Sequence, residues 1–210
     1  MNVALVGHSF VSQWERKLRG SYGWQCHFDR EVAGHLSVSK IVSNVFLLGR
    51  GGARQQMPYL PITTLKLISP DVTILDLGTN DLANISYTIE EAAQWVLDQA
   101  IEIRNKVHGL VYVCSVVPRT GNLRGMSEVM FFQRMEQYNR LLEHMVQNEQ
   151  GIYFHRHKGF YEGRQGKART RLPVHTWSQD GIHPDDFEGD RKYSNSIKSA
   201  IYAAHNKIVG

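Results

Sequence analysis

The sequence has 210 residues, of which 42% are hydrophobic and 21% are charged, and this composition excludes a disordered or fibrous chain. Its formal net charge of +4 is too small to indicate nucleic-acid binding by itself. No apolar stretch approaches the roughly 20 residues that a membrane helix needs, so we expect no membrane span, and we expect residues 1–210 to form a single domain.

Apolar runs of strand length recur along the chain. Runs such as VTILDL and GLVYVCSVV are almost continuously apolar, which is typical of parallel strands that helices cover on both faces. The predicted strands are Asn2–Val6, Asn44–Leu48, Val72–Leu77, Leu110–Val116 and Ile152–Phe154.

Amphipathic segments of helical length alternate with these strands. Residues 88–107 begin with Thr88, and Glu91 completes a capping box three positions later, so this segment is predicted to be a helix. Residues 128–148 and 190–208 are predicted to form two more helices. The alternation predicts a three-layer α/β/α fold with a five-stranded, mostly parallel sheet, in which functional sites lie at the carboxyl ends of the strands.

A serine directly follows the first predicted strand, in the sequence Gly7-His8-Ser9-Phe10. We expect Ser9 to lie at the carboxyl edge of the sheet and at the beginning of a helix, where its own N–H points toward the edge. Taken alone, the position also fits an ordinary helix N-cap.

Glycines and an asparagine follow the next two strands. Gly51 and Gly52 lie in the segment GRGGAR, and glycine allows a backbone N–H to approach a ligand closely. Asn80, in the segment GTND, carries a short amide that can donate a hydrogen bond into the same cleft. Individually, these two segments also fit a tight strand-to-helix turn and an Asx turn.

The fourth polar segment, DGIHP, lies near the C-terminal end of the sequence. Asp180 and His183 are three residues apart, so in a turn the carboxylate can accept a hydrogen bond from the imidazole and fix its tautomer. A lone pair with this spacing also occurs in surface turns.

The four segments together resemble the SGNH (GDSL-like) hydrolase family over residues 5–184, and GTND and DGIH are the most specific parts of the resemblance. The resemblance implies a flavodoxin-like fold and a serine esterase. It implies that Ser9 is the nucleophile, that His183 is the general base and that Asp180 orients the imidazole. A serine hydroxyl needs such a base to become an effective nucleophile.

The resemblance also implies an oxyanion hole. Its donors would be the backbone N–H groups of Ser9 and Gly52 and the side-chain amide of Asn80, with Gly51 as the alternative to Gly52. Preorganised donors of this kind stabilise the tetrahedral intermediate of acyl transfer.

The first segment departs from the family pattern, which usually reads Gly-Asp-Ser, because His8 replaces the aspartate. That aspartate is not a triad member, so we still expect an active enzyme, with His8 as a local pH-sensitive group. We expect His8, Arg54 and Trp177 to contact the substrate, although Trp177 also fits a role as an anchor of its loop.

The predicted function is hydrolysis of carboxylic esters with acetyl or other short acyl groups. The alternative is a nucleic-acid-binding domain of the kind found in some retrotransposon and germ-line proteins, with weak or no esterase activity. It would use the basic segment 155–171, which carries six Lys or Arg residues and one acidic residue, Glu162. This segment fits either a binding site for an anionic partner, such as an acidic sugar, a lipid headgroup or nucleic acid, or a solvated, glycine-rich surface loop.

The remaining reactive side chains predict little further chemistry. His155 and His157 have no carboxylate or thiol partner at a ligand spacing, so we predict neither a metal nor a cofactor. The two cysteines, Cys26 and Cys114, do not form a disulfide-rich pattern, which favours a reducing, cytoplasmic location.

Overall fold

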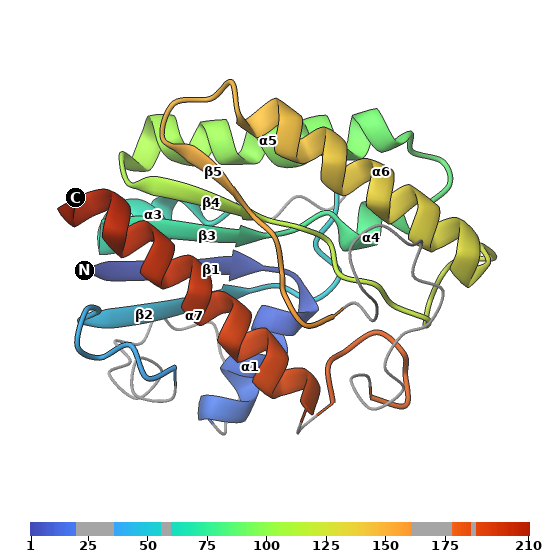
Figure 1. The fold of residues 1–210 in the computed structure, drawn as a ribbon, viewed down its shortest axis with the longest axis horizontal. Coiled ribbons are helices and arrows are strands. Elements are labelled where there is room, and N and C mark those ends of the chain that lie inside the picture. The colour runs from blue at the N-terminus through green and yellow to red at the C-terminus, as the bar shows by residue number, and fades with distance from the viewer. Residues whose placement is uncertain (20–35, 56–59, 161–177, 186–187) are drawn as a thin grey trace.

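A five-stranded parallel sheet forms the centre of the protein (Figure 1). The computed structural model describes residues 1–19, 36–55, 60–160, 178–185 and 188–210. The strand order is β2-β1-β3-β4-β5, and every neighbouring pair is parallel. The strands are β1 (Asn2–Gly7), β2 (Asn44–Gly49), β3 (Val72–Asp76), β4 (Leu110–Cys114) and β5 (Ile152–His155).

Helices cover both faces of the sheet and make the outer two layers (Figure 1). On one face lie α1 (Ser9–Arg19) and α7 (Glu188–Val209), whose apolar residues share a core with that face. On the other face lie α3 (Ile62–Ile68), α5 (Ile89–Val107) and α6 (Glu128–Val146). A short helix, α4 (Thr79–Leu82), follows β3 at the carboxyl edge of the sheet.

Side chains that alternate between the two faces of the sheet divide the interior into two cores, as in the inner strand β1. In β1, Val3 and Leu5 pack with Trp14 of α1, whereas Ala4 and Val6 pack on the opposite face. All four side chains of this strand are fully buried, which explains why its sequence is apolar without alternation.

The predicted architecture is confirmed, including the number, the direction and the approximate position of the strands. Two strands end earlier than predicted, because the chain after Asp76 turns at Gly78 with a φ of 100° and the chain after Cys114 leaves the sheet. The capping box of α5 is confirmed: the Glu91 N–H donates to Thr88 Oγ1 at 3.0 Å, and the Thr88 N–H donates to the Glu91 carboxylate at 2.7 Å.

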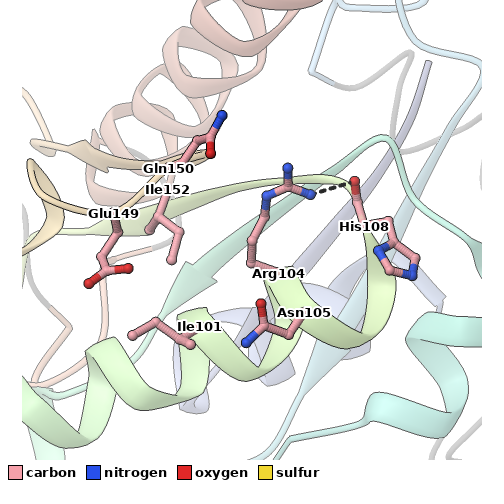
Figure 2. Close-up of a pocket in the computed structure, with 7 residues that line it drawn as sticks. All are labelled: Ile101, Arg104, Asn105, His108, Glu149, Gln150 and Ile152. Carbon is pink, nitrogen blue, oxygen red and sulfur yellow. Dashed lines mark hydrogen bonds between the residues drawn. The ribbon is translucent and has the colours of Figure 1, made fainter.

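A surface hollow of about 410 Å³ lies at the amino ends of β4 and β5, away from the predicted site at the carboxyl ends of the strands. Figure 2 shows the residues that line it. The hollow is lined by residues at the end of α5 and the beginning of β5. There, Arg104 donates to the His108 carbonyl at 2.8 Å, so a carbonyl group at the C-terminal end of α5 has a hydrogen-bond partner. In the described part of the chain, no helix is long and apolar enough to cross a membrane.

Candidate active site

Three of the predicted segments meet at the carboxyl edge because they follow three adjacent strands (Figure 1). Gly7, at the end of β1, is in register with Gly49 of β2 and with Asp76 of β3. The segments that begin with Ser9, Arg50 and Leu77 therefore leave the sheet side by side, as the parallel topology requires.

Ser9 is the first residue of α1 and is partly exposed. The helix is started by a hydrogen bond from the Ser12 N–H to the His8 carbonyl at 3.1 Å. The Ser9 Oγ atom lies 3.5 Å from Nδ1 of His8. The hydroxyl group is thus at the edge of the sheet and at a helix N-terminus, where the local backbone favours negative charge.

Asp180 and His183 form a close pair in a tight turn. The Asp180 Oδ2 atom and the His183 Nδ1 atom are 2.5 Å apart. Oδ1 of the same carboxylate accepts hydrogen bonds from the Ser178 hydroxyl at 2.6 Å and from the Ile182 and His183 N–H groups at 2.8 and 3.0 Å. Burial alone would raise the pKa of Asp180, but these hydrogen bonds outweigh it and hold the pKa well below its usual range. The carboxylate therefore stays ionised beside the imidazole.

The turn is fastened to the segment that follows β4. The N–H groups of Thr120 and Gly121 both donate to the Gly181 carbonyl, at 2.8 and 2.9 Å. A Cβ atom on Gly121 would overlap the Asp180 carbonyl oxygen, so glycine permits this close approach. The position of the Asp180–His183 pair is consequently set by the sheet and not only by the C-terminal segment.

The imidazole of His183 leaves one nitrogen without a partner. Its Nδ1 faces Asp180, while its Nε2 is buried and makes no hydrogen bond with any described residue. The ring packs edge-on against Phe10, the residue after Ser9, with 5.9 Å between the ring centroids. His183 thus packs against the first turn of α1, which begins at Ser9, and the described structure has no hydrogen bond between the two residues. Catalytic hydrogen bonds are often long or poorly aligned until substrate binds.

Asn80 and Asp81 lie in α4, and each side chain forms a hydrogen bond with the backbone next to the Gly51–Gly52 turn. Nδ2 of Asn80 donates to the Ala53 carbonyl at 3.1 Å, and the Asp81 carboxylate accepts the Gln55 N–H at 2.7 Å. These two bonds fasten the Gly51–Gly52 turn to α4. Both glycines are exposed, Gly52 has a φ of 74°, and neither N–H is hydrogen-bonded to a described residue.

Burial changes the acidity of Asp81, the residue after Asn80. Its side chain is fully buried, and this burial raises its pKa to about 6 in spite of the hydrogen bond from Gln55 and the nearby Arg54. The second carboxylate oxygen is buried without a hydrogen-bond partner, which fits a carboxyl group that holds its proton in mildly acidic solution.

Sequence reasoning missed Arg119, which contacts Asn80. It follows β4, an inner strand after which no polar residue was singled out from the sequence. The Arg119 side chain is only 2% exposed. Its Nη1 donates to the Asn80 Oδ1 atom at 3.3 Å, and its Nη2 donates to the Asn122 carbonyl at 3.1 Å. The signal that could have found it is position alone, because the end of β4 reaches the same edge as Asn80.

Sequence reasoning also missed a buried polar cluster beneath Ser9. Asp76, the last residue of β3, accepts a hydrogen bond from the Tyr193 hydroxyl at 2.5 Å, and its Oδ1 lies 3.6 Å from His8 Nε2 and 3.9 Å from His157 Nε2. Burial alone would raise the pKa of Asp76, but the nearby imidazoles of His8 and His157 hold the pKa well below its usual range.

The structure corrects the predicted surface character of part of segment 155–171. His155, His157 and Phe160 are buried, because the chain after β5 passes beneath α7, where both imidazoles contact the Ser196 hydroxyl. Burial lowers the pKa of His155 to about 4, and the neighbouring His157 adds to this effect. The rest of the basic segment, with Arg164, Lys167, Arg169 and Arg171, lies outside the described residues.

The three residues predicted to contact substrate have different surroundings. His8 is 2% exposed and lies under Ser9, between Phe10 and Asp76. Arg54 is partly exposed beside the glycine turn, and Trp177 lies outside the described residues, as does Cys26. Cys114 is a buried free thiol.

Comparison with known proteins agrees with this arrangement of strands and polar segments. Residues 5–187 match the model of the GDSL-like Lipase/Acylhydrolase family. Among curated protein sequences, none matches the chain. The chain belongs to the GDSL-like Lipase/Acylhydrolase family, a class of hydrolases and esterases.

Solved structures with the same fold include three from bacteria. A GDSL-like lipase from Bacteroides thetaiotaomicron is 19% identical, with a TM-score of 0.64 over 97% of this chain and 88% of that one. A family 3 carbohydrate esterase from Clostridium thermocellum is 16% identical, with a TM-score of 0.62 over 100% and 99%. An acetylxylan esterase from Geobacillus stearothermophilus is 13% identical, with a TM-score of 0.56 over 95% and 93%. At these identities the likeness concerns the fold.

Proposed function

We propose that this protein is a serine esterase that hydrolyses carboxylic esters with acetyl or other short acyl groups. The observation that carries the proposal is the Asp180–His183 pair, 2.5 Å apart, whose Nε2 is buried without a hydrogen-bond partner among the described residues and whose ring packs against Phe10, the residue after Ser9. Asp180 holds the proton on Nδ1 of the imidazole. Nε2 is therefore the basic nitrogen, as a general base for a serine requires.

In the proposed reaction the Ser9 Oγ atom attacks the acyl carbon while its proton passes to His183 Nε2. The negative charge that develops on the carbonyl oxygen is stabilised by the N–H groups of Ser9 and Gly52 and by the Asn80 amide. His183 then gives its proton to the departing alcohol, which leaves an acyl group on Ser9. A water molecule, deprotonated by His183, releases the acid and restores Ser9.

Two observations support a small acyl group. Phe10 and His183 pack against each other beside Ser9, so the apolar surface next to the nucleophile is already partly covered. Two of the structures with the same fold are a carbohydrate esterase and an acetylxylan esterase. We therefore include acetylated carbohydrates among the substrates to be tested.

The proposal is tested with p-nitrophenyl esters of increasing acyl length, from acetate to palmitate. We expect turnover to be highest with acetate and to fall by about 10⁴-fold or more in Ser9→Ala, which removes the nucleophile. Ser12→Ala, one helical turn further along α1, is the matched control and should retain wild-type turnover. Equal turnover by Ser9→Ala and the wild type would contradict the proposal, and a preference for palmitate would contradict its short acyl group.

A further inference from the structure

Arg119 is a charged side chain buried beside the proposed site without a carboxylate partner. It is 2% exposed, its Nε is buried without a hydrogen-bond partner, and within the described residues it forms no salt bridge. Its guanidinium lies 5.5 Å from the centre of the Phe131 ring. Burial of an ion costs several kcal/mol unless other groups compensate it, so its location requires an explanation.

The charge of Arg119 persists in spite of burial. Burial lowers the pKa of Arg119 to about 10, and Arg124 adds to this effect, but the group is still protonated at neutral pH. Its polar contacts are the carbonyl oxygens of Asn80 and Asn122. The positive charge is therefore directed at the dipole of an amide and not at an anion of the resting protein.

The contact with Arg119 determines the orientation of the Asn80 amide. Arginine is only a donor and a backbone carbonyl is only an acceptor, so Oδ1 must face Arg119 and Nδ2 must face the Ala53 carbonyl. One N–H of Nδ2 then remains for a ligand. A cation at Oδ1 draws electron density away from Nδ2 and strengthens that N–H as a donor.

We propose that Arg119 positions and polarises the Asn80 amide as an oxyanion donor, acting through Asn80 without touching the substrate. The inference rests on the proposed function, in which Asn80 stabilises the oxyanion. When the tetrahedral intermediate forms, its negative charge lies on the far side of the amide from Arg119. The negative charge then compensates the buried cation in the transition state more than any group does in the resting protein. An interaction accelerates a reaction only if it is stronger in the transition state than in the ground state.

The test is a double-mutant cycle between Arg119 and Asn80 with p-nitrophenyl acetate as substrate. We expect Arg119→Met to lower kcat roughly tenfold or more, with KM almost unchanged, while Asn80→Ala lowers it by about 10²–10³-fold. In the Asn80→Ala background, Arg119→Met should change kcat by less than about twofold. An equal effect of Arg119→Met in both backgrounds would overturn the proposal, because a merely structural role does not depend on Asn80.

Phenylboronic acid, which forms a tetrahedral anionic adduct with a serine, provides a second measurement. Arg119→Met should raise the inhibition constant of phenylboronic acid by the same factor by which it lowers kcat. Arg119→Lys, which keeps the charge but loses the fork of donors, should be affected less than Arg119→Met and replaces it if the methionine variant does not fold. Wild-type kcat and inhibition in a folded Arg119 variant would also overturn the proposal.

The matched control is Arg134→Met. Arg134 is a partly buried arginine that donates to the carbonyls of Tyr87 and of Leu82, the last residue of α4, and within the described residues it forms no hydrogen bond with Asn80. The Arg134→Met variant should have a lower melting temperature, while its kcat stays within about twofold of the wild-type value. If Asn80→Ala is impaired but Arg119→Met is not, only the role of Arg119 is wrong. If Ser9→Ala is fully active, the proposed function is wrong, and the role of Arg119 with it.

Discussion

Asp180 uses its two carboxylate oxygens for different tasks. Oδ1 accepts three hydrogen bonds from the turn itself, and Oδ2 faces Nδ1 of His183. An asparagine can reproduce the first task but not the second, because one of its two terminal atoms is a donor. Substitution of Asp180 by asparagine can therefore test the catalytic role of the carboxylate while the hydrogen bonds that hold the turn are kept.

We expect Asp180→Asn to keep the fold and lose most of the activity. Its Oδ1 can still accept the three bonds of the turn, but its Nδ2 would donate to His183 Nδ1 and move the imidazole proton to Nε2, where it blocks proton transfer from Ser9. We predict a fall in kcat of about 10²–10⁴-fold, with the melting temperature within a few degrees of the wild-type value. Asp180→Ala, which also removes the acceptor of the turn, should lose both activity and stability. Wild-type kcat in Asp180→Asn would exclude Asp180 from the proposed triad.

At the scale of the elements, contact between α1 and the end of β2 fixes the position of Ser9. A Cβ atom on Gly49 would overlap the Ser12 nitrogen and stand 2.5 Å from Ser12 Cα and 2.7 Å from the Val11 carbonyl carbon. These are backbone atoms, so a side chain cannot be accommodated by a change of rotamer. The absence of a side chain at Gly49 allows α1 to begin directly over the carboxyl edge.

We therefore expect Gly49→Ala to displace the beginning of α1. The overlap should lower the free energy of unfolding by about 1–3 kcal/mol. Displacement of the nucleophile by a fraction of an ångström should reduce esterase turnover by up to about 10²-fold. Gly51→Ala is the control for stability, since a Cβ atom there meets nothing within 4 Å. Equal free energies of unfolding for the two variants, measured by urea denaturation, would show that α1 is not held in this way.

The elements were predictable from sequence because their signals are local. Buried parallel strands are continuously apolar, Thr88 and Glu91 are three residues apart, and Asp180 and His183 lie in one turn. Ser9 and Asn80 were singled out in the same way, because each lies within a few residues of the end of a strand.

The missed residues have no local signal. Asp76 lies inside the apolar run VTILDL, and its partners His8, His157 and Tyr193 come from other segments of the chain. Arg119 looks like an ordinary surface residue in the sequence and becomes buried only through the packing of the segment after β4. Charge compensation between residues that are far apart in the sequence arises only in the folded state, so no rule based on sequence spacing detects it.

At the scale of the whole molecule, the cluster around Asp76 joins segments that are far apart in sequence. Asp76 ends β3, His8 precedes α1, His157 follows β5, and Tyr193 belongs to α7. Because the folded pKa of Asp76 is depressed, its ionised form stabilises the fold. This stabilisation is present above the unfolded pKa, about 3.9, and is lost as the pH falls below that value.

We expect Tyr193→Phe to weaken this dependence on pH. Loss of a hydrogen bond to a buried carboxylate should lower the free energy of unfolding by about 1.5–3 kcal/mol at pH 7. The difference from the wild type should shrink only as the pH falls well below the unfolded pKa of about 3.9, since a carboxylate with fewer partners is less depressed in pKa and regains its proton in the folded state first. Tyr202→Phe, at an exposed position of α7, is the control and should follow the wild-type curve. Parallel curves for Tyr193→Phe and the wild type in denaturant titrations would mean that Tyr193 contributes only packing.

The distribution of the site along the chain has a consequence for biosynthesis. Ser9 precedes all but the first strand, whereas Asp180 and His183 follow β5, and α7 covers Asp76 only from the last part of the sequence. A nascent chain that has left the ribosome as far as His155 contains the whole described sheet and the nucleophile, but not the proposed base. The sheet can therefore assemble during translation before the base that the proposed mechanism requires has been made. In the proposed mechanism, Ser9 becomes a nucleophile only after Asp180 and His183 have been synthesised and their turn has folded against the segment that follows β4.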